Sequence, residues 1–392
     1  MIDTGAILGL PEYEITSIER SGEGVTIRAR YTGVVGCPDC GGTALRSKGK
    51  YERSVRHESW GNRNTKLVLD ARKWECKGCG GGFRQRFPGI LRGRRSTEPL
   101  HRQVFQQHWD GISRSRLAER FGIGAATVER WFQDQLARLC AERSGALCPR
   151  VLGIDEHFFT RKKGYATTLC DLEKHKVFDV VAGRSEASLE GYLRALKGKD
   201  RVRVVCMDLS STYRAIVRKH FPAARIVADR FHVVRLVSHH FLACWKDLDP
   251  AGSRNRGLLS LLRRHRRNLK PEQKVRLSRY FADHPAVSAV WRFKEHLTGL
   301  LLKKHRTRRQ CSRLIPRLLR AIDALRTSGF GPLITLGDTM HSWAAEIATM
   351  WRFTRNNGIT EGFHTKMEVL QRQAYGFRNF NNYRKRVQMM CS

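Results

Sequence analysis

Short apolar runs alternate with amphipathic stretches through the middle of the chain. Residues 202–207 form a β-branched apolar run that stops at Asp208, and residues 225–228 form a second run that stops at Asp229. Runs of this length are typical of buried strands. Between them, residues 212–220 have the apolar spacing of an amphipathic helix, with two serines in front as possible caps. This order predicts a right-handed parallel βαβ unit with both acids at one edge of the sheet.

The two acids at the strand ends allow two interpretations. Asp208 and Asp229 precede helices, and acids are favoured at helix N-termini by the helix dipole. Two carboxylates at one sheet edge also repel each other, and they stay together only when a cation joins them. The first interpretation predicts ordinary helix ends, and the second predicts a functional site.

The residues before this unit predict three further strands. Residues 151–159 form an apolar run interrupted by Asp155 and Glu156, and residues 165–170 and 176–182 have the pattern of a hairpin. Because side chains alternate along a strand, only one of the two acids can join a common site. Three antiparallel strands, a helix and then a βαβ unit follow one another in the order of a ribonuclease-H-like fold.

The first part of the chain, residues 1–95, predicts short strands and a metal site. Two C-x-x-C pairs, Cys37 with Cys40 and Cys76 with Cys79, are each followed by two glycines. Four thiolates from two such knuckles make a closed tetrahedral zinc site. A redox-active C-x-x-C is the alternative, and the presence of two similar pairs argues against it. We therefore expect a zinc ribbon.

Residues 96–145 change to a helical pattern. Ser113 can cap one helix, Gly122 can make a tight turn, and a second helix then begins, with its apolar residues facing the first. This is the arrangement of a helix-turn-helix, whose second helix enters the DNA major groove. Thr127 and Arg130 are the residues of that helix for which we expect DNA contact.

The charge balance indicates a polyanionic partner. The 392 residues include 73 Lys and Arg against 36 Asp and Glu, a formal net charge of +37. Nucleic acid is the usual partner of so basic a chain. An anionic membrane surface is the competitor, but we find no apolar run near the ~20 residues of a membrane span and no amphipathic anchor with exposed aromatics. Without a secretory signal, and with seven cysteines scattered outside the knuckles, we expect a cytoplasmic protein.

The chain after Asp229 is predicted to be helical and strongly basic, above all over residues 246–343. Charge runs are often solvated helix faces. Here few acids lie nearby, which favours contact with phosphates. The residues expected to make it are Arg263, Arg264, Arg266, Arg267, Lys303, Lys304 and Arg306.

A last amphipathic helix begins near Thr360, which we expect to cap it. Glu361 lies off the apolar stripe of this helix. Together with Asp155 and Asp208 it would complete a set of three acids. Two-metal phosphoryl transfer needs such carboxylates around two divalent ions, and hard oxygen ligands select magnesium or manganese.

Four segments resemble the ISL-three family of insertion-sequence transposases. They are GIDE at 153–156, MDLSSTYR at 207–214, DRFH at 229–232 and NNGITEGFHTKMEVLQRQAYGFRNF at 356–380. The two cysteine knuckles and the helix-turn-helix also match the amino-terminal half of that family. His364 and Glu368 depart from it, since Asn and Lys are common there.

The resemblance implies a DDE transposase whose catalytic triad is Asp155, Asp208 and Glu361. Its catalytic domain would span residues 150–392, with a helical insertion over about 246–343. Asp229 and His232 match a D-x-x-H signature and would be auxiliary residues.

The resemblance also implies a function. The ribbon and the helix-turn-helix would bind the terminal inverted repeats of the element as double-stranded DNA. The triad would hold two Mg²⁺ (or Mn²⁺) ions, cleave strands and join them to target DNA, and a structural Zn²⁺ would hold the ribbon. Pairing two DNA ends implies at least a dimer. A catalytically silent repressor derived from a transposase is the alternative, and the three intact acids disfavour it.

Overall fold

The computed structural model describes residues 4–22, 24–91, 93–142, 147–353 and 358–391. The chain divides into two compact units, Met1–Glu142 and Arg143–Ser392. Each unit is described by itself below. Within the described residues, no helix has both the length and the apolar character needed to cross a bilayer.

Unit 1 begins with a five-stranded sheet. Its order is β1-β2-β4-β3, and β5 pairs with β4. Alternate residues of β4, including Leu67, Leu69 and Ala71, are buried and form the core of this sheet with residues of β2. The predicted short strands are confirmed, although β3 and β4 form a longer hairpin than expected. The elements are α1 (Thr4–Ile7), β1 (Tyr13–Ser21), β2 (Gly24–Tyr31), β3 (Leu45–Trp60), β4 (Arg63–Cys76) and β5 (Gly82–Arg84).

Three helices complete unit 1: α2 (Glu98–Trp109), α3 (Arg114–Phe121) and α4 (Ala125–Ala141). The side chain of Ser113 caps α3 by accepting from the Arg116 amide, and Gly122 ends α3 in the left-handed region at φ 57°. Leu117 of α3 and Val128 of α4 are fully buried between the helices. The predicted helix-turn-helix geometry is confirmed. His57 of β3 joins it to the sheet, because its Nδ1 lies 2.9 Å from Oγ1 of Thr97, the cap of α2.

Unit 2 contains a mixed five-stranded sheet of order β10-β9-β6-β7-β8. Strand β6 runs antiparallel to β7 and parallel to β9, and β9 runs parallel to β10. The three antiparallel strands and the parallel βαβ unit are therefore as predicted. The strands are β6 (Val151–Thr160), β7 (Gly164–Asp171), β8 (Lys176–Ala182), β9 (Val204–Met207) and β10 (Arg225–Ala228).

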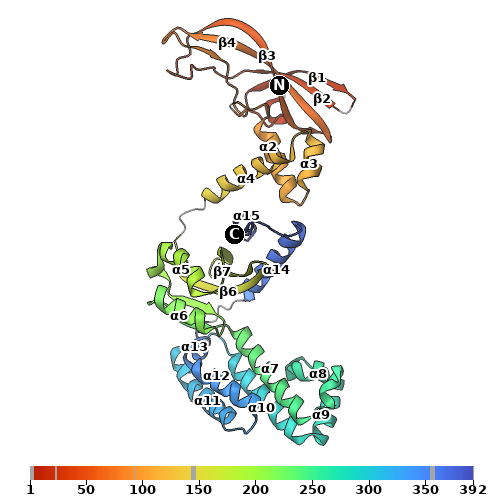
Figure 1. Cartoon of the computed structure of the whole chain (residues 1–392), viewed down its shortest axis with the longest axis vertical. Coiled ribbons are helices and arrows are strands. Elements are labelled where there is room, and N and C mark those ends of the chain that lie inside the picture. Colours follow the sequence, from red (N-terminus) through yellow and green to blue (C-terminus); the bar gives the residue numbers. More distant parts are fainter. Residues whose placement is uncertain (1–3, 23, 92, 143–146, 354–357, 392) are drawn as a thin grey trace. The chain divides into compact units, whose positions relative to one another are not determined.

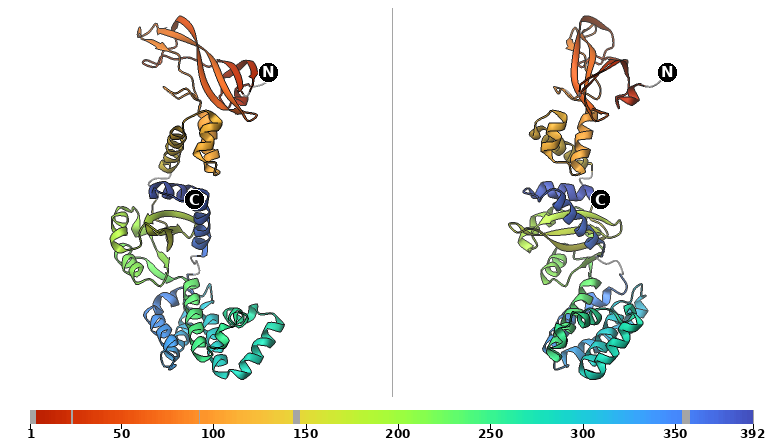
Figure 2. Two further views of the ribbon diagram at one scale, coloured as in Figure 1. Left: turned by 45° about the vertical axis from the view of Figure 1, so that its right-hand side comes forward. Right: turned by 90° about the vertical axis from the view of Figure 1, so that its right-hand side faces the viewer.

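Helices cover both faces of this sheet (Figure 1). Ile154 of β6 belongs to the core shared with α5 (Glu186–Ala195) and α6 (Ser211–His220). Phe159 of the same strand belongs to a separate core with α14 (Gly358–Gln373) and α15 (Phe380–Met390). Both views in Figure 2 keep these two pairs of helices on opposite sides of the sheet.

The chain between β10 and α14 is helical, as predicted. Arg230, at the start of α7, is buried and donates from its guanidinium to the carbonyl oxygens of Leu301, Lys303 and Met350. These bonds tie the inserted helices to the sheet edge. The helices are α7 (Arg230–Leu248), α8 (Arg256–Arg263), α9 (Pro271–Asp283), α10 (Pro285–Leu301), α11 (Arg308–Arg326), α12 (Gly331–Ser342) and α13 (Ala344–Thr349), and the short 3-10 turns are η1 (Lys199–Arg201), η2 (Gly252–Arg254) and η3 (Arg266–Asn268).

One predicted helix cap is wrong. Thr360 is buried inside α14, which already includes Gly358, so it does not cap the helix. Its hydroxyl interacts with the buried Cys170 thiol and not with the start of the helix. Asn356 and Asn357 of the matched segment lie outside the described residues.

Candidate active site and metal centres

Asp155 and Asp208 meet at the carboxyl end of the parallel strands. Ile154 of β6 pairs with Met207, the last residue of β9. The acids that follow these two residues, Asp155 and Asp208, therefore lie side by side. Potential ligand atoms of Asp155, Asp208 and His232 all lie within 4.8 Å of one another. Asp155 is only 4% exposed. The alternation predicted for β6 is confirmed, since Glu156 turns to the other face and pairs with Arg184.

His232 supplies the cation that these carboxylates need. Its Nδ1 donates to Asp229 Oδ2 at 2.7 Å and lies 2.8 Å from Asp208 Oδ1. One ring hydrogen cannot point at both oxygens, so the Asp208 contact is an ion pair that leaves this buried oxygen without an aligned donor. Burial lowers the pKa of His232, but the contacts with Asp208 and Asp229 outweigh it and raise the pKa to about 10.

Asp229 fits both interpretations of the strand-end acids, and Asp208 fits only the second. Asp229 is the N-cap of α7 and also holds His232, so it serves both as a helix end and as part of the site. Asp208 is not a cap, because Ser210 caps α6. Its carboxylate is left to face the cluster.

Asp155 is poised to receive a cation. Burial raises its pKa most, and the charge of Asp208 adds to this, bringing the pKa to about 7 despite the opposing effects of His232 and of the Glu156 amide. That amide donates to Asp155 Oδ1 at 2.8 Å. The buried carboxylate of Asp155 lies beside the Asp208 oxygen that has no aligned hydrogen-bond donor. Together these oxygens suit a divalent metal that prefers hard oxygen ligands.

Glu361 lies outside this group of ligand atoms. It is in the first turn of α14 as described, and burial is the main cause of its raised pKa. The charges of Asp229 and Asp208 raise the pKa further, and His232 and Arg235 oppose them. Glu361 therefore interacts with the same charges as the two aspartates without joining their cluster.

Two histidines that the sequence did not assign to the site, the buried His157 and the half-buried His364, lie beside Asp155. Oγ1 of Thr168 is 2.9 Å from His157 Nδ1 and 3.1 Å from His364 Nε2, and the Tyr383 hydroxyl is 2.9 Å from His157 Nε2. His364 Nδ1 also lies 3.9 Å from Asp155 Oδ2. Burial lowers the pKa to about 3 for His157 and about 4 for His364, so both rings are neutral. The signal for His157 was its place two residues after Asp155, on the same face of the strand.

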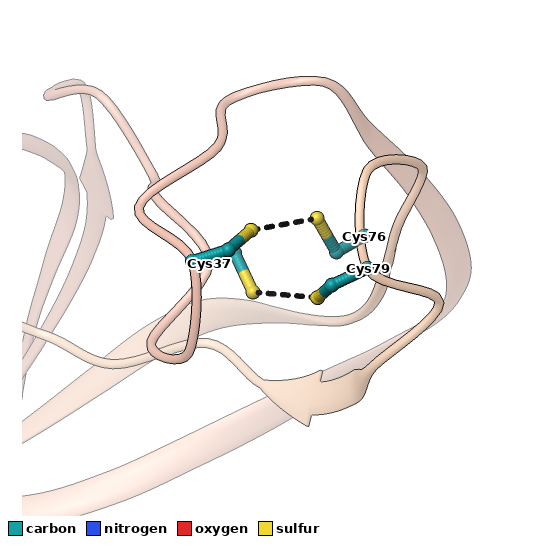
Figure 3. Close-up of side chains that lie close together, drawn as sticks. Cys37, Cys76 and Cys79 are labelled. Carbon is teal, nitrogen blue, oxygen red and sulfur yellow. Dashed lines mark hydrogen bonds between the residues drawn. The ribbon is translucent and has the colours of Figure 1, made fainter.

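The four knuckle cysteines converge in unit 1. Sγ of Cys37 is 3.7 Å from that of Cys79, and Sγ of Cys40 is 3.5 Å from that of Cys76. Zinc–sulfur bonds of about 2.3 Å in a tetrahedron separate sulfurs by about 3.8 Å. Figure 3 shows the thiols of two loops pointing toward one another. The predicted cluster is confirmed, and it fits a structural zinc ion.

The two knuckles have the same backbone. Gly41 donates to the Cys37 carbonyl and Gly80 to the Cys76 carbonyl, each at 2.9 Å. Both glycines have positive φ, 73° and 74°, which is why glycine follows each pair. Backbone hydrogen bonds from Cys79 and Gly78 lower the pKa of the Cys76 thiol to about 7, whereas the neighbouring sulfurs raise the pKa of Cys40 and Cys79. Four thiolates so close together need a cation to hold them.

Comparison with known proteins decides the family. A family model described as a transposase, of the ISL3 DDE type, matches residues 152–387. The chain belongs to the ISL3 family of DDE transposases. A second model, described as the zinc finger of transposase IS204/IS1001/IS1096/IS1165, matches residues 33–79 and so spans all four cysteines. The chain is also 24% identical over 354 residues to the transposase for insertion sequence element IS1001 of Bordetella parapertussis, covering 88% of this chain and 85% of that protein. It is an insertion-sequence transposase, and the family performs phosphoryl transfer.

A basic groove lies in unit 1 of the transposase. It has a volume of about 1590 Å³, above the ~300–1,000 Å³ usual for small ligands. It runs along β3 and β4 and the segment after β5 and reaches Gly122, the turn of the helix-turn-helix. Among its described lining residues the one acid is Glu52, which pairs with Arg28. The cations in its lining are Arg53, Arg56, Lys66, Arg84, Arg86, Arg94 and Arg95.

The residues predicted to contact DNA fall into three places. On α4, Arg130 is exposed and Thr127 is half-buried. Arg263, Arg264, Arg266 and Arg267 are exposed at the connection between α8 and α9. Lys303, Lys304 and Arg306 follow α10, and the Lys303 carbonyl accepts from Arg230, the neighbour of Asp229. The last group is thus tied to the start of α7, beside the carboxylates.

Other acids considered for the site have structural partners. Glu346 is buried, and its Oε1 lies 3.1 Å from Arg214 Nε. Glu368 is exposed on α14 and pairs with Arg372 one turn later at 3.4 Å. Neither belongs to the carboxylate cluster.

Proposed function

We propose that this transposase binds the terminal inverted repeats of its element through unit 1 and cleaves and joins strands at Asp155, Asp208 and Glu361 with two magnesium ions. The observation that carries the proposal is the buried Asp155 beside the half-buried Asp208, one of whose oxygens has no aligned hydrogen-bond donor. The strand order of unit 2, which agrees with a ribonuclease-H-like core, supports it. Incubating the protein with its own element ends and magnesium tests it, because a silent repressor would bind these ends without cutting them.

The side chains of the site would have different roles in catalysis. Bound magnesium would activate water or a 3′-hydroxyl and stabilise the leaving oxygen. Asp155 and Asp208 would hold the ions, and Glu361 would complete the set. The His232 cation balances Asp208 and Asp229 until metal arrives, and Asp229 fixes the orientation of its ring. The neutral rings of His157 and His364 keep the wall beside Asp155 free of competing charge.

His232 gives the first prediction. His232→Ala should slow cleavage about 10- to 100-fold and leave it detectable, as is usual for residues that support metal ligands. Asp229→Asn should give a smaller loss, because Asn caps α7 as well as Asp does and only the charge is removed. His239→Ala, an exposed histidine of the same helix, is the matched control. Single-turnover cleavage of a labelled element end measures all three. A loss with His232→Ala as complete as with Asp208→Asn would make His232 a direct ligand.

The groove in unit 1 supports repeat binding by that unit. A polymer of phosphates matches its seven cations, and its continuity with the Gly122 turn brings the backbone of a bound duplex to α4. Oligomerisation on DNA follows from the need to bring two ends together, and we propose at least a dimer.

The salt dependence of end binding tests this assignment. Replacing Arg84, Arg86, Arg94 and Arg95 by Ala should reduce the slope of log K against log salt by up to about 0.9 for each lost phosphate contact. Replacing Arg263, Arg264, Arg266 and Arg267 should also flatten it, with little change in sequence preference. The control removes equal charge from exposed positions of unit 1 outside the groove, namely Arg20, Arg46, Lys50 and Arg72. Equal effects of the groove and control sets would assign binding to net charge alone.

A further inference from the structure

Two large aromatic side chains are exposed near the turn of the β6–β7 hairpin. Phe158 is 52% exposed and Tyr165 is 38% exposed, and they are direct partners across the two strands. Their ring centroids are 5.7 Å apart at 80°. Phe158 lies on the face of β6 opposite to Asp155. Adjacent exposed rings of this size commonly mark a binding surface.

One cation stacks on the ring pair, and three more lie on the adjoining turn. The guanidinium carbon of Arg184 lies 4.2 Å from the Tyr165 ring centroid, and its Nη1 is 3.3 Å from both carboxylate oxygens of Glu156. Arg184 is further fixed because Gly183, the residue before it, donates to the Tyr165 carbonyl at 2.9 Å. The turn of the hairpin adds the exposed residues Arg161, Lys162 and Lys163.

This end of the hairpin extends past the catalytic carboxylates. Strand β6 pairs with β9 only from Val151 to Ile154, so from Asp155 onward this edge of β6 has no strand partner among the described residues. At about 3.4 Å per residue, Phe158 lies about 10 Å along the strand from Asp155. A DNA strand cleaved at Asp155 can therefore reach the rings within a few nucleotides, around an open sheet edge.

The combination of rings and cations selects one class of ligand. Aromatic rings stack on bases without regard to sequence, and nearby Arg and Lys bind the phosphates. A base inside a duplex has both faces covered by its neighbours, so the ligand must be unpaired. An apolar peptide or lipid tail would make no use of Arg184 or of the basic turn.

We propose that Phe158, Tyr165 and Arg184 form a platform that stacks an unpaired nucleobase of the DNA strand next to the cleavage point, with its phosphate at the Arg161–Lys163 turn. The proposal rests on the proposed function, since it takes the cleaved strand to lie at Asp155. Stacking would hold the strand end after cutting, or offset the cost of opening the last base pairs before it.

Binding of single-stranded DNA without cleavage tests the platform. Full-length, zinc-loaded protein is titrated, in buffer lacking magnesium, with a single-stranded oligonucleotide of the element end that carries 2-aminopurine, whose fluorescence stacking quenches. Phe158→Ala and Tyr165→Ala should each weaken binding about tenfold, the double variant should lose the quenching, and Tyr165→Phe should behave as wild type. Tyr375→Ala is the control, because Tyr375 is 99% exposed elsewhere on unit 2. Binding of the duplex end should remain within about twofold for all variants.

The outcomes separate stacking from a structural role of the rings. A cross-strand aromatic pair contributes to hairpin stability, so thermal unfolding of each variant is measured alongside. Unchanged quenching in the double alanine variant, or an equal loss with Tyr375→Ala, would overturn the proposal. Asp155→Asn should quench normally. If that variant also cuts DNA, the proposed function fails while the platform stands, and the two ideas are therefore tested independently.

Discussion

Asp155→Asn, Asp208→Asn and Glu361→Gln are each expected to abolish strand cleavage while folding and end binding persist. These substitutions keep the shape of the side chain and remove the charge that a divalent metal needs. The loss should be at least about a thousandfold, because residues that only support a ligand cost about 10- to 100-fold. The effects should not add, so the Asp155→Asn/Asp208→Asn double variant should cut no less than either single one. Cleavage of labelled end DNA in magnesium and in manganese is the measurement.

In the metal-free protein, Asp155→Asn should increase the stability of the fold. Burial and the charge of Asp208 raise the pKa of Asp155 to about 7. When folding raises the pKa of an acid, the free energy of unfolding of the protein falls as the pH rises from the unfolded pKa to the folded pKa. Asp155→Asn removes this loss, so it should raise the melting temperature, and by more above the folded pKa than well below it. An Asp155→Asn protein that melts earlier at every pH would contradict this account of the cluster.

Glu368→Gln is the matched control for Glu361→Gln. Both acids are on α14, but Glu368 is exposed and only pairs with Arg372. Glu346→Gln is a poorer control, because Glu346 is buried against Arg214 and its loss would affect folding. Normal cutting by Glu361→Gln together with a dead Glu368→Gln would show that the third acid is wrong. Normal cutting by Asp155→Asn, Asp208→Asn and Glu361→Gln would show that these acids take no part in the chemistry.

Cys37→Ser and Cys76→Ser are expected to lose zinc and to weaken end binding by more than tenfold. The four thiols of the knuckles converge on one point, and in such sites the binding energy of the metal, about 10–16 kcal/mol in small modules, is folding energy. The sheet has its own apolar core, around Leu67 and Leu69, so we expect the knuckle end to unfold before the rest of unit 1. Metal analysis of purified protein should find about one zinc per chain.

Cys140→Ser is the control for the zinc experiment, since Cys140 lies on α4 of the same unit. It should retain zinc and bind ends as wild type does. Zinc-free protein that still binds its ends with full affinity would show that the metal is dispensable for repeat recognition.

Much of the fold could be predicted because it rests on local patterns. The strand runs of β6, β9 and β10 follow from short apolar segments, and the helix-turn-helix follows from Ser113, Gly122 and the apolar spacing around them. The zinc cysteines follow from spacing alone, because four thiolates in two knuckles have few other uses. The parallel pairing of β9 with β10 follows from chain order, since a strand, a helix and a strand in sequence form a right-handed crossover unit.

The local sequence pattern did not predict features that depend on tertiary packing. Thr360 has the residue type of a cap, yet it lies buried inside α14, because packing against the sheet and not side-chain type sets where this helix runs. The histidines of the site show the same limit. His157 and His364 lie more than two hundred residues apart in sequence, and only the packing of α14 on β6 brings their rings within 5.2 Å.

The sequence by itself determined the family, the parallel βαβ unit, the cysteine cluster and the acids at one sheet edge, because each depends on motifs and spacing along the chain and on strand direction. The tertiary structure alone decided how the charges are balanced. It makes His232 the cation between Asp208 and Asp229, leaves one Asp208 oxygen without an aligned donor, and keeps Glu361 outside the cluster. The reason is physical, since the attraction between charges depends on distance and burial, and neither can be read from the order of residues.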